Sequence, residues 1–258
     1  MFITENRNGY IKARKVADGS KQRTYDGYNK SDGLSPAVSN DSIFLTGVVD
    51  ACEKRAIAIL DIANTFLHAE NDKKILMILC GKLSDMMVQV YLIMYRKYVT
   101  YSPKGQDILY VKLSKALYGM LRAALLFYKI LRSDLENMGS EINPYDPCLA
   151  NTMVNSHQMT ICWHVEDLKV SHKDDNAVTA LAEKLAELYG PKTTVSHGKV
   201  HEYLGMDIDW ASVPGTMIVS MIKYLHKVFE ELPEVLRGTK ASPDGDHLFT
   251  VIEDGKRS

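Results

Sequence analysis

The sequence predicts an α+β fold, in which helices and strands are interleaved around a mostly antiparallel sheet. Short apolar runs alternate with longer segments whose apolar residues recur every three or four positions. Turn residues at 143–147 interrupt the chain, and those at 155–157 separate two strand candidates closely enough for a hairpin. Apolar residues make up 46% of the chain and charged residues 24%, an ordinary balance for a globular domain.

The first part of the chain is a loop-rich basic segment over residues 1–40, with short β-like pieces. Apolar residues at helical spacing then predict a helix over 42–52. The apolar run 55–60 predicts a buried strand that ends at Asp61, and a second apolar run covers 75–79.

A long helix is predicted in the middle of the chain. Ser114 is a suitable N-cap, and Gly139 is a typical residue just past a helix end. Between them, apolar residues recur at helical intervals as one stripe: Leu117, Leu121, Leu125, Tyr128, Leu131, Leu135 and Met138.

The second half of the chain predicts a hairpin followed by shorter elements. Strands are expected over 148–154 and 159–170, joined by the turn residues 155–157. The elements expected after them are a helix over 174–189, strand pieces over 195–210, a strand over 216–220 and a helix over 221–231.

Several classes of protein are disfavoured by the sequence. No apolar run approaches the roughly 18–20 residues that span a bilayer, and the N-terminus lacks the apolar core of a secretory signal. The four cysteines show no Cys-x-x-Cys pair, so neither a zinc site nor a disulfide framework is expected. We therefore expect a reducing intracellular compartment and no membrane partner.

Charge is distributed unevenly although the formal net charge is only −1. Lys and Arg outnumber acids by seven to three over residues 1–30 and by eight to one over 95–132. Such segments could hold phosphates beside an acidic, metal-binding centre. Charge alone nevertheless favours the plainer interpretation, in which these are solvated faces of helices and strands.

Two acidic positions interrupt apolar strands. Asp61 ends the run 55–60, and Glu166-Asp167 lies inside the predicted strand 159–170. Carboxylates among apolar residues are costly to bury and commonly pair with cations or metal ions. Two Mg²⁺ ions about 3.5–4 Å apart can catalyse phosphoryl transfer, but an acidic doublet by itself is more often a hairpin tip in solvent.

Five motifs occur in order along the chain: DIANTFLHAE (61–70), LYVKLSKALYGMLRAALLFYKIL (109–131), NPYDPCLAN (143–151), WHVEDL (163–168) and HEYLGMDID (201–209). They resemble the reverse transcriptase domain of copia-type (Ty1-like, pseudovirus) retrotransposons. KARKVADGSKQ (12–22) and KASPDGDHLF (240–249) resemble its flanking segments, so the resemblance covers nearly the whole chain.

The resemblance implies a fingers-and-palm fold, with an antiparallel palm sheet backed by helices. A fingers-like basic segment would occupy 1–40, the palm with its fingers insertions 41–210, and the truncated start of a thumb or connection region 211–258. Few residues follow 210, so the chain is expected to be a fragment of a polyprotein or a decayed reading frame.

The resemblance also implies roles for single residues. Asp61 matches the first metal-binding aspartate, Asp167 matches the second aspartate of the doublet, and Glu166 stands at the first. The residues that match the nucleotide-binding positions are Lys12 and Arg14 for the triphosphate, Phe66 beneath the sugar, and Tyr118 and Gly119. The residues that match the primer grip are Tyr203, Leu204, Gly205 and Met206.

The implied activity is RNA-directed DNA polymerisation with Mg²⁺, or alternatively Mn²⁺, as cofactor. The implied partners are an RNA or DNA template with its primer, deoxynucleoside triphosphates and other domains of a retroelement polyprotein. The implied location is the cytoplasm, in a virus-like particle, or the nucleus. A phosphotransferase of another kind would need a loop such as G-x-x-x-x-G-K-[ST], which the sequence lacks.

The sequence departs from the family pattern most seriously at Glu166, where the family has aspartate. The extra methylene moves the carboxylate by roughly 1 Å, whereas active sites tolerate about 0.5 Å, and Mg²⁺ requires near-ideal octahedral geometry. Further departures lie at 63–65, 91–98 and Ser140. The alternative function is therefore a catalytically inactive retroelement remnant that retains at most nucleic-acid binding.

Overall fold

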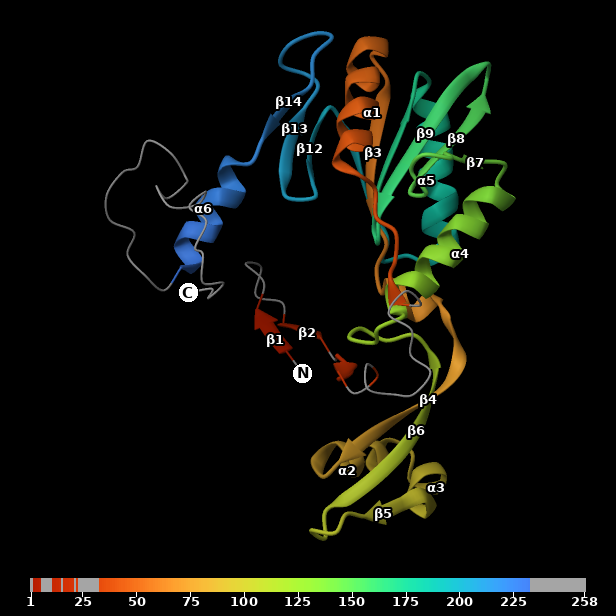
Figure 1. Cartoon of the computed structure of the whole chain (residues 1–258), viewed down its shortest axis with the longest axis vertical. Helices are drawn as coiled ribbons and strands as arrows, with labels where there is room; N and C mark the ends of the chain where they lie inside the picture. The colour runs from red at the N-terminus through yellow and green to blue at the C-terminus, as the bar shows by residue number, and fades with distance from the viewer. Residues whose placement is uncertain (1, 6–10, 15, 21, 23–32, 233–258) are drawn as a thin grey trace, which may run out of the picture. The chain divides into compact units, whose positions relative to one another are not determined.

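The structure is a computed structural model that describes residues 2–5, 11–14, 16–20, 22 and 33–232. The chain divides into two compact units, Met1–Ser220 and Met221–Ser258. In the described part of the chain, no helix is both long and apolar enough to cross a lipid bilayer. The expected α+β class is confirmed, since helices are interleaved with antiparallel sheets (Figure 1).

The largest sheet has six strands in the order β11-β3-β10-β9-β8-β7, and every neighbouring pair is antiparallel. Its strands are β3 (Ala56–Asp61), β7 (Glu141–Ile142), β8 (Leu149–Val154), β9 (His157–His164), β10 (Asp167–His172) and β11 (Thr194–Gly198). The expected hairpin is confirmed as β8 and β9, joined at Asn155 and Ser156, which both have positive φ.

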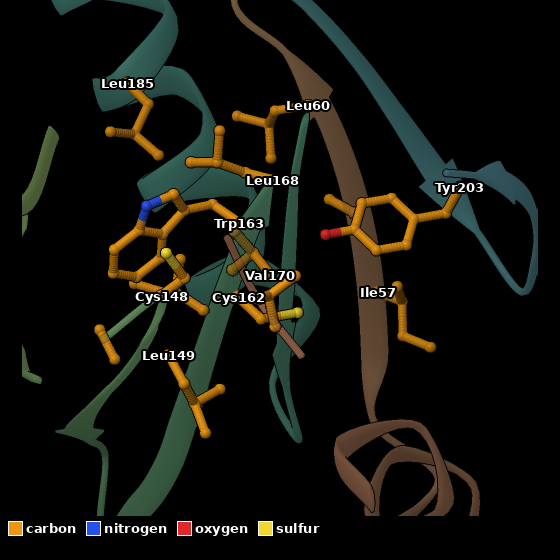
Figure 2. Packing of buried hydrophobic residues seen from close by; sticks show 14 of the residues in the cluster. Ile57, Leu60, Cys148, Leu149, Cys162, Trp163, Leu168, Val170, Leu185 and Tyr203 are labelled. Carbon is orange, nitrogen blue, oxygen red and sulfur yellow. The ribbon is translucent and has the colours of Figure 1, made fainter. Parts of the chain in front are cut away.

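Helices cover both faces of this sheet, which explains why its central strands are nearly continuous apolar runs. Tyr128 of α4 (Ala123–Asn137) stacks with Trp163 of β9, and Figure 2 shows Leu185 of α5 (Asp175–Tyr189) beside Leu168 of β10. Helix α1 (Asn40–Glu53) contacts the opposite face through Asp50. Side chains that alternate along β3 and β10 are therefore buried on both sides.

A second, three-stranded sheet has the order β4-β6-β5 and carries the short helices between its strands. Its elements are β4 (Glu70–Cys80), α2 (Lys82–Val90), α3 (Leu92–Tyr95), η4 (Arg96–Tyr98), β5 (Val99–Tyr101) and β6 (Asp107–Lys115). The apolar run 75–79 is thus a strand, inside β4.

The prediction of one helix from Ser114 to Gly139 is wrong in its first third. Ser114 lies in strand β6, which pairs with β4, and helix α4 begins only at Ala123. Leu109, Val111 and Leu113 alternate with polar or exposed residues, which is the period of a strand. Strand pairing therefore outweighs the helical spacing of the leucines between β6 and α4.

The third sheet contains β12 (Val200–Tyr203), β13 (Met206–Asp209) and β14 (Ile218–Ser220). These strands confirm the strand pieces predicted over 195–210 and the strand predicted over 216–220. A separate hairpin pairs β1 (Phe2–Glu5) with β2 (Ile11–Arg14). Helix α6 (Ile222–Glu231) belongs to the second unit and confirms the last predicted helix.

Gly119 lies where two distant segments meet. The Ala17 N–H donates to the Tyr118 carbonyl at 2.7 Å, and the Leu121 N–H donates to Gln22 Oε1 at 3.1 Å. Gly119 has φ +88, and a Cβ atom there would stand 2.0 Å from the Ala17 oxygen. Only glycine fits this contact.

We predict that Gly119→Ala costs at least about 3 kcal/mol of unfolding free energy, because it combines strain at positive φ with a backbone clash. Gly139→Ala is the matched control, since Gly139 has φ +90 with nothing within 4 Å. This control should cost about 1 kcal/mol. Chemical denaturation of both variants measures the difference, and equal costs would contradict the packing described here.

Candidate active site

The acidic doublet lies at the turn between β9 and β10. Strand β9 ends at His164, Val165 adopts φ +54, and β10 begins at Asp167. The prediction of one continuous strand over 159–170 is therefore wrong, because the left-handed residue at Val165 reverses the chain. His164 and Asp167 face each other as the last pair of this hairpin.

Asp61 meets the doublet across the next strand pair. Asp61 ends β3 directly opposite Asp167 of β10, and Thr194 of β11 faces it on the other side. The Ile62 N–H donates to the Glu166 carbonyl at 3.0 Å, which ties the β9–β10 turn to the end of β3. Directly opposed residues have Cβ atoms about 4.5–5.5 Å apart on the same face, so the two aspartates are close neighbours.

The three carboxylates differ in burial, and none of them pairs with a basic side chain of the described residues. Asp61 is exposed, whereas Glu166 and Asp167 are half-buried. Burial, reinforced by the nearby charges of Glu166 and Asp61, raises the pKa of Asp167 to about 6, and His164 opposes this only in part. No lysine or arginine among the described residues forms an ion pair with any of the three carboxylates.

The donor chemistry fits a hard divalent cation, because carboxylate oxygens are the ligands that Mg²⁺ and Mn²⁺ prefer. Asp61 and Asp167 supply two carboxylates on one face, and Glu166 brings a third within the same turn. Within the described residues, however, no three His, Cys, Asp or Glu side chains already surround one point. At least one carboxylate must therefore turn to bind an ion.

Phe66, Tyr118 and Gly119, the predicted nucleotide-binding residues that the structure describes, lie together. Phe66 belongs to η3 (Thr65–His68), a few residues after Asp61, and its ring centroid is 4.5 Å from that of Tyr118. Asn64 begins this turn with φ +56. The side chains of the other two predicted residues, Lys12 and Arg14, lie outside the described part of the structure.

The predicted primer-grip residues form the β12–β13 hairpin. Tyr203 pairs with Met206 across a two-residue turn in which Leu204 and Gly205 both have positive φ, as a tight hairpin of type I′ requires. Tyr203 is only 1% exposed, burial raises its pKa, and its hydroxyl donates to the Asp167 carbonyl at 3.5 Å. Of these four residues, Tyr203 and Met206 are buried, and Leu204 and Gly205 are partly exposed.

The sequence interpretation missed a buried ion pair beneath the aspartates. Lys169 of β10 and Asp50 of α1 are each 1% exposed and are paired, and the largely buried Arg55 lies 3.9 Å from the same carboxylate. The signal was present, since Lys169 interrupts the apolar run 168–170. Spacing alone, however, does not identify its partner.

Asp167 makes stability depend on pH in a defined direction. Its folded-state pKa of about 6 lies above that of an unfolded aspartate, so the folded state binds the proton more tightly. This contribution is full below about pH 4 and is lost as the pH rises through about 6. Charge on Asp167 therefore destabilises the fold at neutral and alkaline pH.

Asp167→Asn is expected to raise the unfolding free energy at pH 8 by about 1–2 kcal/mol, since solvent screening reduces the full shift of about 3 kcal/mol. The gain should fade towards pH 4 in metal-free buffer. Denaturant titrations across this range measure it, and exposed Glu183→Gln on α5 controls for net charge. An Asn variant no more stable than the parent at pH 8 contradicts the assignment.

Comparison with known proteins identifies a family for this chain. The family model described as "Reverse transcriptase (RNA-dependent DNA polymerase)" matches residues 3–243. The Arabidopsis thaliana Retrovirus-related Pol polyprotein from transposon RE1 is 26% identical over 83% of this chain, and that from transposon RE2 is 25% identical over 86%. The chain spans only 13% and 14% of the lengths of these relatives.

A structure of Candida tropicalis telomerase, in complex with a TWJ fragment of telomeric RNA, covers 74% of this chain and 35% of its own. It is 11% identical with a TM-score of 0.38, a likeness too weak to carry an argument. The family match extends over most of the chain and includes every acidic residue of the site. The chain belongs to the reverse transcriptase family, as a domain of the copia-like retrotransposon Pol type.

Proposed function

We propose that this chain carries the fingers and palm of an RNA-directed DNA polymerase, and that Asp61, Glu166 and Asp167 are its metal-binding carboxylates. The observation that carries the proposal is the direct pairing of Asp61 with Asp167 at adjacent strand ends. Their charges are balanced by no lysine or arginine of the described residues, and burial, together with the charges of Glu166 and Asp61, raises the pKa of Asp167. Such a site gains stability when it binds divalent cations.

The proposed palm comprises residues 41–210 with its fingers insertions, of which the β4-β6-β5 sheet is the clearest. Residues 1–40 are the proposed fingers-like segment, and 211–258 the start of a thumb or connection region. The proposed ligands are a primer annealed to an RNA or DNA template and deoxynucleoside triphosphates. Other domains of the polyprotein are proposed partners.

Bound Mg²⁺ or Mn²⁺ would activate the primer 3′-hydroxyl and stabilise the phosphate charge that develops during transfer. The protein's own residues mainly position the reactants. Phe66, whose ring lies against Tyr118, is proposed to exclude a ribose 2′-hydroxyl. The β12–β13 hairpin residues Tyr203, Leu204, Gly205 and Met206 are proposed to grip the primer. Lys12 and Arg14 are proposed to hold the triphosphate.

Glu166 limits this activity. It lies in a turn bracketed by the paired residues His164 and Asp167, and its carbonyl accepts a hydrogen bond from the Ile62 N–H. The backbone is therefore not free to retreat and compensate for the longer side chain, and a misplacement of about 1 Å is costly in such sites. We infer that the chain binds a primer–template but extends it poorly.

The test is extension of an oligo(dT) primer on poly(rA) with Mg²⁺ and with Mn²⁺. The parent is expected to show little extension, and Glu166→Asp should increase the rate by at least about tenfold, because the shorter side chain restores the ligand position. Glu183→Asp on α5 makes the same change at an exposed position and should have no effect.

Robust extension by the parent would contradict the assigned defect. Salt-sensitive primer–template binding without extension by either protein would instead support the inactive remnant.

A further inference from the structure

A buried ion pair lies beside the two aspartates, two residues further along β10 and on the same face of the sheet. Lys169 follows Asp167 by two residues on β10, so both side chains project to one face. The Lys169 ammonium donates to Asp50 Oδ2 of α1, and both residues are almost wholly buried. Lys169 also lies 5.9 Å from the centre of the Trp210 ring.

The pair is part of a larger group of charges. Arg55 lies 3.9 Å from Asp50 and 2.9 Å from Glu53, and it donates to Thr160 of β9 at 3.0 Å. The group links α1, the start of β3 and the β9–β10 hairpin. The two buried cations therefore share Asp50, and removing either Lys169 or Asp50 leaves the other buried without its direct partner.

The turn at Val165 and Glu166 fixes β10 against β9, whereas apolar packing alone does not determine the register of this hairpin against β3. A slip by one residue would turn its apolar residues to the wrong face, which the alternation forbids. A slip by two residues keeps every side chain on its face, placing Val170 in the position of Leu168 and His172, which is also buried, in the position of Val170. The same slip would separate Lys169 from Asp50 and move Asp167 by about 6.6 Å relative to Asp61.

We propose that Lys169 and Asp50 are positioning residues, whose pairing fixes the register of β10 against β3 and so holds Asp167 opposite Asp61. The consequence for metal binding rests on the proposed function, whereas the consequence for strand register does not. The Ile62 N–H reports this register directly, because it donates to the Glu166 carbonyl at the end of the paired strands.

The test compares amide hydrogen exchange in the parent, Lys169→Met, Asp50→Leu and the double variant. The readout is the exchange rate of Ile62 divided by that of Trp163, whose N–H donates to Cys148 on the other side of β9. Thermal denaturation is followed in parallel. Leu185→Ala is the control, since it weakens the core on the opposite face without touching the pair.

Each single variant should lower the denaturation midpoint, because it leaves a buried charge unpaired. The double variant should recover the midpoint yet keep an Ile62-to-Trp163 ratio at least about tenfold above the parent, since its register is no longer specified. Leu185→Ala should lower the midpoint and leave the ratio unchanged. A double variant with the parent's ratio overturns the proposal, even if both single variants fail to fold.

A second readout is Mn²⁺ binding followed by electron paramagnetic resonance. The double variant should bind Mn²⁺ at least about fivefold more weakly than the parent, because Asp167 no longer stays opposite Asp61. Unchanged affinity would contradict a link from register to the site. A parent that binds no Mn²⁺ contradicts the proposed function, and the exchange ratio still decides the role of the pair.

Discussion

The antiparallel pairing of β3 with β10 is the constraint on which the site depends. It places Asp61 opposite Asp167, although more than 100 residues separate them in the chain. The same pairing brings the β9–β10 turn, with Glu166, to the end of β3 through the Ile62–Glu166 bond. Both strands are buried between helices, so this arrangement is held by most of the apolar core.

At the end of these strands, the carboxylates proposed for metal binding lower the stability of the fold. Burial of the apolar strand residues favours folding, whereas burial of Asp167, together with the nearby charges of Glu166 and Asp61, raises the pKa of this carboxyl group. A protein optimised only for stability would place a cation or a neutral residue there. Among the described residues neither is present, which is consistent with the proposed metal-binding role of these carboxylates.

Much of the fold could be predicted from the sequence because its elements follow simple periods. The helix of α5 and the β8–β9 hairpin have clear apolar periodicity and turn residues. The sequence predicts too early a start for α4, because leucines at helical spacing follow β6 directly. Residues up to Lys115 form a strand because they pair with β4. Local pattern carries no information about that partner strand.

The site could be predicted only through the motifs of the family. Asp61 and Asp167 each follow or precede an apolar run, but nothing in their local sequence shows that they face each other. Tyr203 is one of the expected primer-grip residues. Its local sequence does not show that its buried hydroxyl donates to the Asp167 carbonyl. Asp50 and Lys169 were missed because an ion pair between a helix and a strand 119 residues apart leaves no local pattern.

The central claim is that the ends of β3 and β10 form one divalent-cation site. Paramagnetic broadening of backbone amide signals by substoichiometric Mn²⁺, with recovery on excess Mg²⁺, tests it most directly. The account predicts broadening centred on Ile62, Glu166, Asp167 and Thr194, and none around the acidic start of α5 at Asp174-Asp175. Broadening spread over exposed acidic residues, or none near Asp167, would contradict the account.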